Sequence, residues 1–320
     1  MLFLGMSCYH PLVAERTKTF SRWFDATGKK YPKVRILGEA KGDLLDVGDY
    51  DCLTFERFLV PCGRCIGCRI DKARDWSVRI MCETKSSLLS SWFLTLTYDD
   101  LHMTDLSLNK HDIKDFIKDL RNYIYYRSGE CIKYFLCGEY GDSSGRKHFH
   151  LIIFNLGDLD IKPRSAKNGY IYYESEIINQ LWNKGFVVIA EVNPQTAAYV
   201  AKYTLKKQGL KKYDDLGVQA PFIMMSTRPG IGYKYLTDHV QELINKPFIF
   251  MDHKNYPLPR YFKRILEEEY NIPTEFFNDK YIEKNYKVNL AKEIYTKQEL
   301  KKILEAEEAN LEASQKRRSL

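Results

Sequence analysis

The feature that most constrains the fold is a regular order of strand and helix patterns between residue 91 and about residue 210. Two segments, Lys110–Tyr126 and Ser175–Asn183, carry apolar residues at helical spacing. Four further segments have the aromatic, β-branched or Thr-rich composition of strands: Trp92–Tyr98, Ile132–Gly138, His148–Phe154 and Gly185–Val192. The order strand, helix, strand, strand, helix, strand is that of the split βαβ plan of ferredoxin-like and RRM folds. The sequence therefore predicts an α+β protein whose antiparallel sheet carries both helices on one face.

The regions on either side of this core differ from it in composition. Residues 1–90 form a Cys-rich, basic N-terminal region, and residues 91–210 are the predicted core. Residues 211–260 are rich in proline and are expected to be a loop-rich extension packed on the core. Residues 261–320 are charged and are expected to form a helical C-terminal region. A further core helix is predicted to start at Asn193-Pro194, because Pro suits the first helical position.

Composition excludes several classes of protein. The 320 residues are 44% hydrophobic and 14% aromatic, with a formal net charge of +7. No apolar run approaches the roughly 18 residues that cross a bilayer, and Met1–Gly5 is too short for a signal peptide. We therefore expect no membrane association and no secretion. Basic and aromatic residues together are typical of a nucleic-acid binder.

A pair of histidines in one predicted strand is the first candidate site. His148 and His150 point to the same face, because side chains alternate along a strand. Two polar residues on the solvated face of a strand would give the same pattern. Glu139, however, ends the preceding strand, and a short loop folds it back beside the histidines. One carboxylate and two imidazoles predict a divalent-metal site for Mg²⁺ or Mn²⁺, with zinc as the alternative.

Two tyrosines in the last core helix are candidate nucleophiles. Tyr199 and Tyr203 are four residues apart and therefore share a helical face. Lys202 and Lys206 follow them, each three residues later. A nearby cation favours phenolate and can hold a phosphate, so we predict that all four residues are catalytic. The alternative is an ordinary amphipathic helix with snorkelling lysines.

A cysteine triplet is the third candidate site. Cys62, Cys65 and Cys68 have the two-residue gaps of zinc ligands. An iron–sulfur cluster is less favoured, because no further Cys-Pro follows the run. Ordinary free thiols in a reducing compartment are the alternative to zinc. The fourth ligand of a zinc site is left open among four residues: Cys8, His10, Cys52 and Cys82.

Basic residues flank both the triplet and the tyrosines. Arg79 lies on the helix predicted after the triplet, with other arginines around it, and these side chains are expected to contact DNA phosphates. Charge runs are more often solvated faces, but their position beside a predicted cutting site favours DNA. The residues predicted to bind DNA are Lys207, Lys211, Lys212 and Arg228.

These motifs together resemble a known family. His148-Phe149-His150 with Tyr199 and Tyr203 resembles the HUH endonucleases that start rolling-circle replication. Further motifs are similar to those of the replication initiators of small single-stranded DNA phages, the gokushovirus branch of the microviruses. These motifs are the cysteine triplet, Gly138–Gly141 and Arg228–Gly232. The resemblance covers about residues 6 to 240.

The resemblance implies a function. An initiator of this type nicks one strand of a single-stranded or hairpin origin by tyrosine attack, which leaves a 5′-phosphotyrosine and a 3′-hydroxyl primer. It later rejoins the displaced strand into a circle, with one of Tyr199 and Tyr203 nicking and the other serving in strand transfer. A host helicase and polymerase are then the expected partners, and the host cytoplasm is the expected location.

Several alternatives remain open from the sequence. A plasmid- or transposon-type HUH relaxase shares the chemistry, and a metal-dependent nuclease without a covalent intermediate shares the histidines. A zinc hydrolase of the metallo-β-lactamase type is disfavoured because Ile152 stands where its Asp should be. A non-catalytic RRM-like module would carry aromatic residues where this chain has histidines.

Overall fold

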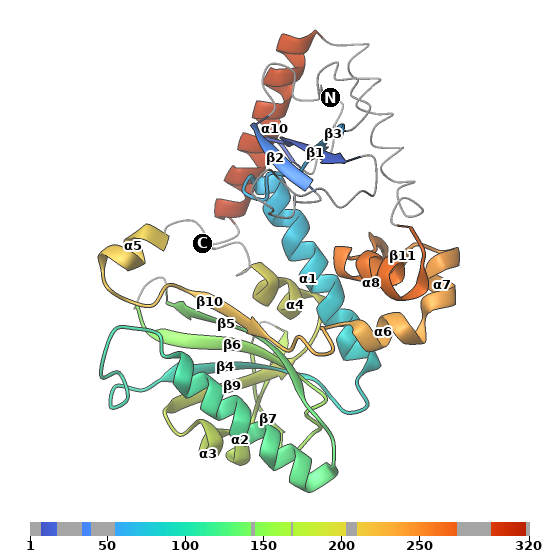
Figure 1. The fold of residues 1–320 in the computed structure, drawn as a ribbon. Coiled ribbons are helices and arrows are strands. Elements are labelled where there is room, and N and C mark those ends of the chain that lie inside the picture. The colour runs from blue at the N-terminus through green and yellow to red at the C-terminus, as the bar shows by residue number, and fades with distance from the viewer. Residues whose placement is uncertain are drawn as a thin grey trace, which may run out of the picture. The chain divides into compact units, whose positions relative to one another are not determined.

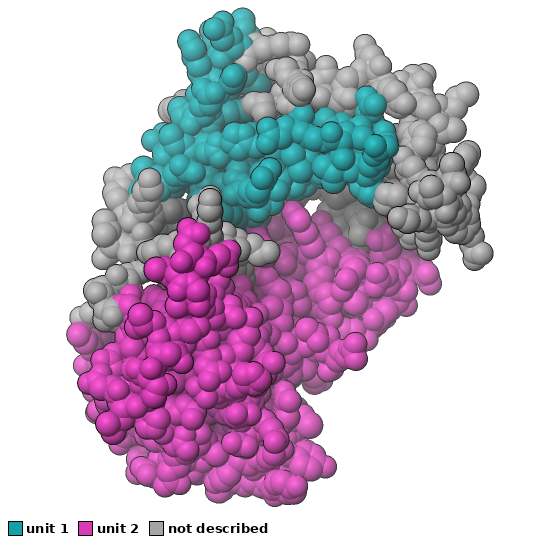
Figure 2. Space-filling view, turned by 60° about the vertical axis from the view of Figure 1, so that its left-hand side comes forward, with its two compact units in different colours: residues 1–71, 278–320 teal, residues 72–277 magenta. Residues whose placement is uncertain are grey.

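The computed structural model describes residues 8–17, 34–39, 55–141, 145–167, 169–202, 210–273 and 296–317. The chain divides into two compact units (Figure 2), one of residues 1–71 with 278–320 and one of residues 72–277. Helix α1 (Ile66–Ser86) begins in the first unit and continues in the second. Within the described residues, no helix is long and apolar enough to span a bilayer.

The first unit contains a small sheet and a long helix. Its three strands are antiparallel in the order β2-β1-β3, with bounds β1 Leu12–Thr17, β2 Val34–Glu39 and β3 Phe55–Val60. Helix α10 (Lys297–Arg317) places Leu300 and Leu304 in a buried cluster with Tyr9 and the start of α1. Segments almost 300 residues apart in sequence therefore share this core.

The second unit is built on a seven-stranded antiparallel sheet (Figure 1) with the order β10-β5-β6-β4-β9-β8-β7. The four predicted strands form its centre. Their bounds are β4 Trp92–Tyr98, β5 Lys133–Tyr140, β6 Lys147–Phe154 and β9 Gly185–Glu191. Three strands were not predicted: β7 Lys162–Lys167, β8 Tyr170–Glu174 and β10 Phe222–Met225. The prediction of an α+β fold with an antiparallel sheet is confirmed.

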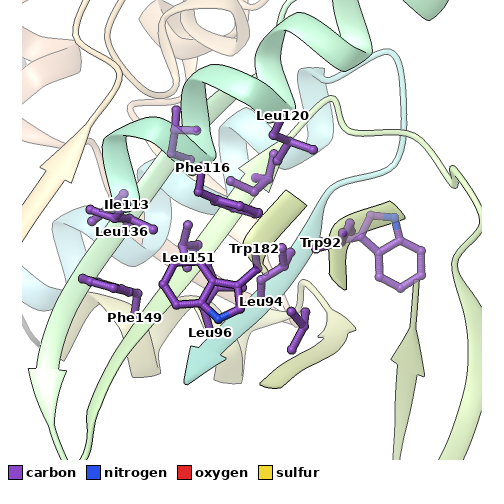
Figure 3. Close-up of a cluster of buried hydrophobic side chains, with 14 of the residues drawn as sticks. Trp92, Leu94, Leu96, Ile113, Phe116, Leu120, Leu136, Phe149, Leu151 and Trp182 are labelled. Carbon is purple, nitrogen blue, oxygen red and sulfur yellow. The ribbon is translucent and has the colours of Figure 1, made fainter. Parts of the chain in front are cut away.

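Two helices cover one face of this sheet, as predicted. Helix α2 (Lys110–Ser128) begins at Asn109, whose side chain accepts from the His111 amide, and α3 (Glu176–Trp182) begins at a Ser cap. Between them and the sheet lies the main core (Figure 3), in which Phe116, Phe149 and Trp182 are almost fully buried. Strand alternation explains the packing, because β4 buries every second residue here.

The opposite face is covered over only part of its area. Ile80 of α1 and Val200 of α4 (Pro194–Lys202) pack on Phe135 and Ile152 of the central strands. The side-chain oxygen of Asn193 accepts from the Thr196 amide at 2.8 Å and so caps α4. Away from α1 and α4, Phe186 of β9 on this face is 63% exposed. The histidines of β6 lie at the border between the covered and the open part.

The rest of the second unit packs on α1. It consists of short elements: α5 Leu210–Asp215, α6 Tyr233–Asp238, α7 Val240–Asn245, β11 Phe248–Met251, β12 Lys254–Pro257 and α8 Arg260–Tyr270. Phe262 and Leu266 of α8 bury against Val78 and Cys82 of α1. The proline-rich segment after the predicted core thus holds short helices and a hairpin.

Candidate active site on the open face of the sheet

Three predicted ligands converge at the border of the open face. Glu139 of β5 stands opposite His148 of β6 in the strand register, and His150 lies two residues further on the same face. The Glu139 Oε1 atom is 2.9 Å from His148 Nε2 and 3.0 Å from His150 Nε2. The side chains of Glu139 and His150 are almost fully buried, whereas His148 is 16% exposed. The arrangement is therefore held in the sheet and reached from one side.

The hydrogen bonds of the outer imidazole nitrogens suit a cation. His148 Nδ1 lies 3.0 Å from the Arg146 carbonyl oxygen, so Nδ1 carries a proton and donates it. His150 Nδ1 is 3.0 Å from the Thr95 hydroxyl. In the neutral form His148 then presents a lone pair at Nε2 to a carboxylate, and two electron-rich atoms need a proton or a cation between them. The donor set and its outer partners fit a divalent metal.

Tyr199 reaches the same point from the other side. Its hydroxyl oxygen is 3.2 Å from His150 Nε2, and its side chain lies on α4. The ring meets His150 edge to face at 5.0 Å between centroids, and Phe93 stacks on His150 at 5.8 Å. Tyr199 is nevertheless 40% exposed. A candidate nucleophile is therefore positioned by packing and is still accessible.

The other predicted catalytic and DNA-binding residues are placed less completely. Lys202 is exposed in the last turn of α4. Arg228 is exposed in the loop after β10. Lys211 and Lys212 belong to α5, but their side chains lie outside the description. The residues that lie outside the described ranges altogether are Tyr203, Lys206 and Lys207.

The phosphate contact predicted for Arg79 is wrong. Arg79 is 8% exposed, and its guanidinium lies 4.0 Å from the Trp76 ring centroid and 4.1 Å from that of Tyr261. Its Nε donates to the Ile231 carbonyl at 3.0 Å. Burial lowers the pKa of Arg79 to about 10, so it stays charged at neutral pH. Arg79 thus fixes the loop at Ile231 instead of contacting solvent.

Glu83 completes this buried arrangement and was not singled out from the sequence. It accepts from the Gly232 amide at 2.6 Å and pairs with Lys133 at 2.8 Å. The neighbouring Gly230 has no room for a side chain, since a Cβ there would lie 2.7 Å from the Tyr261 hydroxyl. The Arg228–Gly232 motif is therefore shaped by packing on α1. The available sequence signal was the four-residue spacing of Arg79 and Glu83 on one helix.

The cysteine triplet gains one partner in the first unit. Cys8 joins Cys62, Cys65 and Cys68 in a cluster whose sulfur atoms all lie within 4.8 Å of one another. The other candidates for this position are accounted for separately. His10 pairs with Glu308 at 2.9 Å, Cys82 is buried in the core beside α8, and Cys52 lies outside the described residues.

Comparison with known proteins places the chain in a family. Residues 91–208 match a family model described as a replication-associated protein of the ORF2 type. The replication-associated protein ORF2 of Spiroplasma virus 4 is 37% identical over 240 residues, which is 72% of this chain and 73% of that protein. This chain belongs to the phage replication-associated proteins.

Two further members of the family are similar over comparable lengths. The replication-associated protein VP4 of Bdellovibrio phage phiMH2K is 30% identical over 239 residues, 70% of this chain and 72% of that protein. The replication-associated protein ORF4 of Chlamydia phage 1 is 29% identical over 248 residues, 73% of this chain and 61% of that protein. No solved structure matches the chain. The family match begins just before β4 and extends past α4, so it includes every residue of the converging cluster.

Proposed function

We propose that this replication-associated protein is a rolling-circle initiator of the HUH endonuclease type, which nicks a single-stranded or hairpin phage origin. One observation carries the proposal: the Tyr199 hydroxyl lies 3.2 Å from His150 Nε2, which is itself 3.0 Å from Glu139. A nucleophile and a metal-ligand set thus meet on an accessible sheet face. The β-α-β-β-α-β order of the core supports the same reading.

The reaction transfers a DNA phosphate to a tyrosine. The Tyr199 oxygen forms a bond to the scissile phosphorus, and the bond from that phosphorus to the 3′ oxygen breaks. The phenolic proton is released to solvent, and the departing 3′ oxygen takes up a proton. A 5′-phosphotyrosine and a 3′-hydroxyl remain, so later rejoining needs no nucleotide cofactor.

The side chains around Tyr199 have separate tasks. Glu139, His148 and His150 would hold Mg²⁺ or Mn²⁺, which when bound polarises a non-bridging oxygen of the phosphate. Phe93 and His150 hold the tyrosine ring by edge-to-face contacts. Lys202, one turn along α4, supplies a cation that favours phenolate and binds phosphate. Tyr203 takes part in the strand transfer that closes the displaced circle.

The remaining proposals concern partners and place of action. Lys207, Lys211, Lys212 and Arg228 contact DNA phosphates, which makes binding salt-dependent. A host helicase and polymerase extend the 3′-hydroxyl in the host cytoplasm.

The deciding experiment follows a covalent adduct. Single strands and hairpins tiled across the phage genome, each labelled at the 3′ end, are incubated with the protein and Mn²⁺. We expect one sequence to give a labelled adduct on a denaturing gel, mapped by peptide sequencing to Tyr199 or Tyr203. Tyr126→Phe, a change at an exposed tyrosine of α2, is the matched control and should leave the adduct unchanged.

Two outcomes would contradict the proposal. A double variant, Tyr199→Phe with Tyr203→Phe, that still cleaves would indicate water as the nucleophile and a metal nuclease without a covalent intermediate. Full nicking in EDTA would remove the metal from the mechanism.

A further inference from the structure

The cysteine cluster of the first unit is not used by the proposed reaction. Its four sulfur atoms come from two parts of the chain, Cys8 before β1 and Cys62, Cys65 and Cys68 around the start of α1. We propose that these four cysteines bind a structural zinc ion that joins the N-terminal segment to helix α1. This site goes beyond the proposed nicking activity.

The distances between the sulfur atoms suit a tetrahedral ion. Cys62 Sγ is 4.0 Å from Cys68 Sγ, and Cys65 Sγ is 4.0 Å from Cys8 Sγ. Four thiolates at about 2.3 Å from one zinc ion have sulfur atoms roughly 3.8 Å apart. A disulfide would require a sulfur separation of about 2 Å. The cluster is therefore already close to the size of a zinc site and too open for a disulfide.

Backbone amides point at the sulfur atoms. The Cys62 amide donates to Cys8 Sγ at 3.2 Å, and the Tyr9 amide donates to Cys65 Sγ at 3.4 Å. Cys62 Sγ accepts from the amides of Arg64 and Cys65 at 3.4 and 3.3 Å. Four thiolates around a divalent ion leave a net negative charge, and such donors stabilise it. The positive N-terminal end of α1 acts in the same direction.

The turn between the first two ligands depends on a glycine. Gly63 has a φ of 73°, in the left-handed region that residues with a Cβ adopt at a cost. This conformation lets the amides that follow Cys62 fold back toward its sulfur atom. The Cys-Gly-Arg-Cys sequence therefore builds a compact ligand loop immediately before the helix.

An apolar shell closes the cluster. Cys8, Cys65 and Cys68 are buried together with Ile66, and α10 contributes Leu300 and Leu304 to the same cluster. A site with four protein ligands and an apolar cover has no open position for a substrate, which is the mark of structural zinc. The ion would thus stabilise the contact between the N-terminal segment, the start of α1 and α10.

The first test measures the metal directly. Full-length protein purified without chelators is analysed by elemental mass spectrometry in the His148→Ala background, which removes the other cluster as a source of zinc. We expect about one zinc ion per chain. Protein that contains no zinc and does not take it up would overturn the proposal, and so would a brown chromophore with bound iron.

Cobalt substitution identifies the ligands. After zinc removal, Co²⁺ added to the same protein should give the intense visible absorption of a tetrahedral thiolate site together with sulfur-to-cobalt charge transfer. Cys8→Ser and Cys68→Ser should each weaken Co²⁺ binding at least tenfold. Cys131→Ser, a change at an exposed cysteine outside the cluster, should leave it unchanged. Loss of the signal in Cys131→Ser, or its persistence in Cys8→Ser, would refute the assignment.

Discussion

The two polar clusters of the molecule use opposite designs. The Glu139–His148–His150 cluster mixes oxygen and nitrogen donors on a rigid sheet and has an exposed tyrosine at its edge. The cysteine cluster uses four sulfur donors on a turn and a helix end, and apolar side chains cover it. Three protein donors leave positions for water and substrate, whereas four close the site. The same chain thus separates a candidate site for chemistry from a candidate site for stability.

The most damaging change to the open cluster is the loss of a ligand. His148→Ala should lower the nicking rate by about a thousandfold or more, because charge on the phosphate is no longer offset. Binding to the same oligonucleotide should change little, since phosphate contacts elsewhere supply it. His111→Ala, a change at an exposed histidine of α2, serves as the control. Equal losses of nicking and binding would show that His148 acts only through folding.

The closed cluster should respond in stability and not in chemistry. Cys68→Ser should cost the first unit several kcal/mol of unfolding free energy, because zinc binding contributes directly to folding. Limited proteolysis should then cut within residues 1–71, while nicking of a short oligonucleotide persists. If Cys68→Ser abolished nicking and left the proteolysis pattern unchanged, the separation between the two clusters would fail.

A subtler change tests how a ligand is oriented. Thr95→Val removes the hydroxyl 3.0 Å from His150 Nδ1 and should weaken Mn²⁺ binding by about 10- to 100-fold. Thr97→Val is the matched control on the same strand and face, because His148 is held instead by the Arg146 carbonyl. Calorimetric titration with Mn²⁺ and a thermal melt separate metal affinity from stability. Equal effects of the two changes would remove the positioning role of Thr95.

The smallest expected effect concerns the open part of the sheet face. Phe186 lies in the same cross-strand row as Thr97 and His148, and its ring is 63% exposed. A base of the bound strand can stack on it, so Phe186→Ala should cost about 1 kcal/mol of single-strand affinity. Phe250→Ala, in the β11–β12 hairpin, should have no effect. Fluorescence anisotropy with a labelled single strand measures both.

The sequence predicted the elements whose patterns are strong. The alternation in β4 and β6 and the helical spacing in α2 gave those elements within a few residues. Strand β7 was missed because its residues are all exposed and polar, so no buried face creates a pattern. Strand β10 is short and partly buried, and only its pairing with β5 defines it.

The candidate sites were predictable to different extents. His148 and His150 could be paired from strand alternation alone, and Glu139 from the hairpin between β5 and β6. Cys8 could not be chosen among the possible fourth ligands, since its approach to Cys62 depends on a fold spanning 54 residues. Arg79 misled because a charged residue in a basic run gives no sign that two aromatic rings will enclose it.

The pairing of Glu139 with His148 has a consequence for how sequences of this kind can change. The β5–β6 hairpin sets the register that brings them opposite each other. If one residue were deleted from its loop and β6 slid to compensate, both imidazoles would turn toward the core beneath α2. Substitutions in the loop leave that register intact. Natural variants should therefore keep the length of residues 141–146 constant while their identities drift, and deep mutational scanning with single-residue indels would reveal this asymmetry.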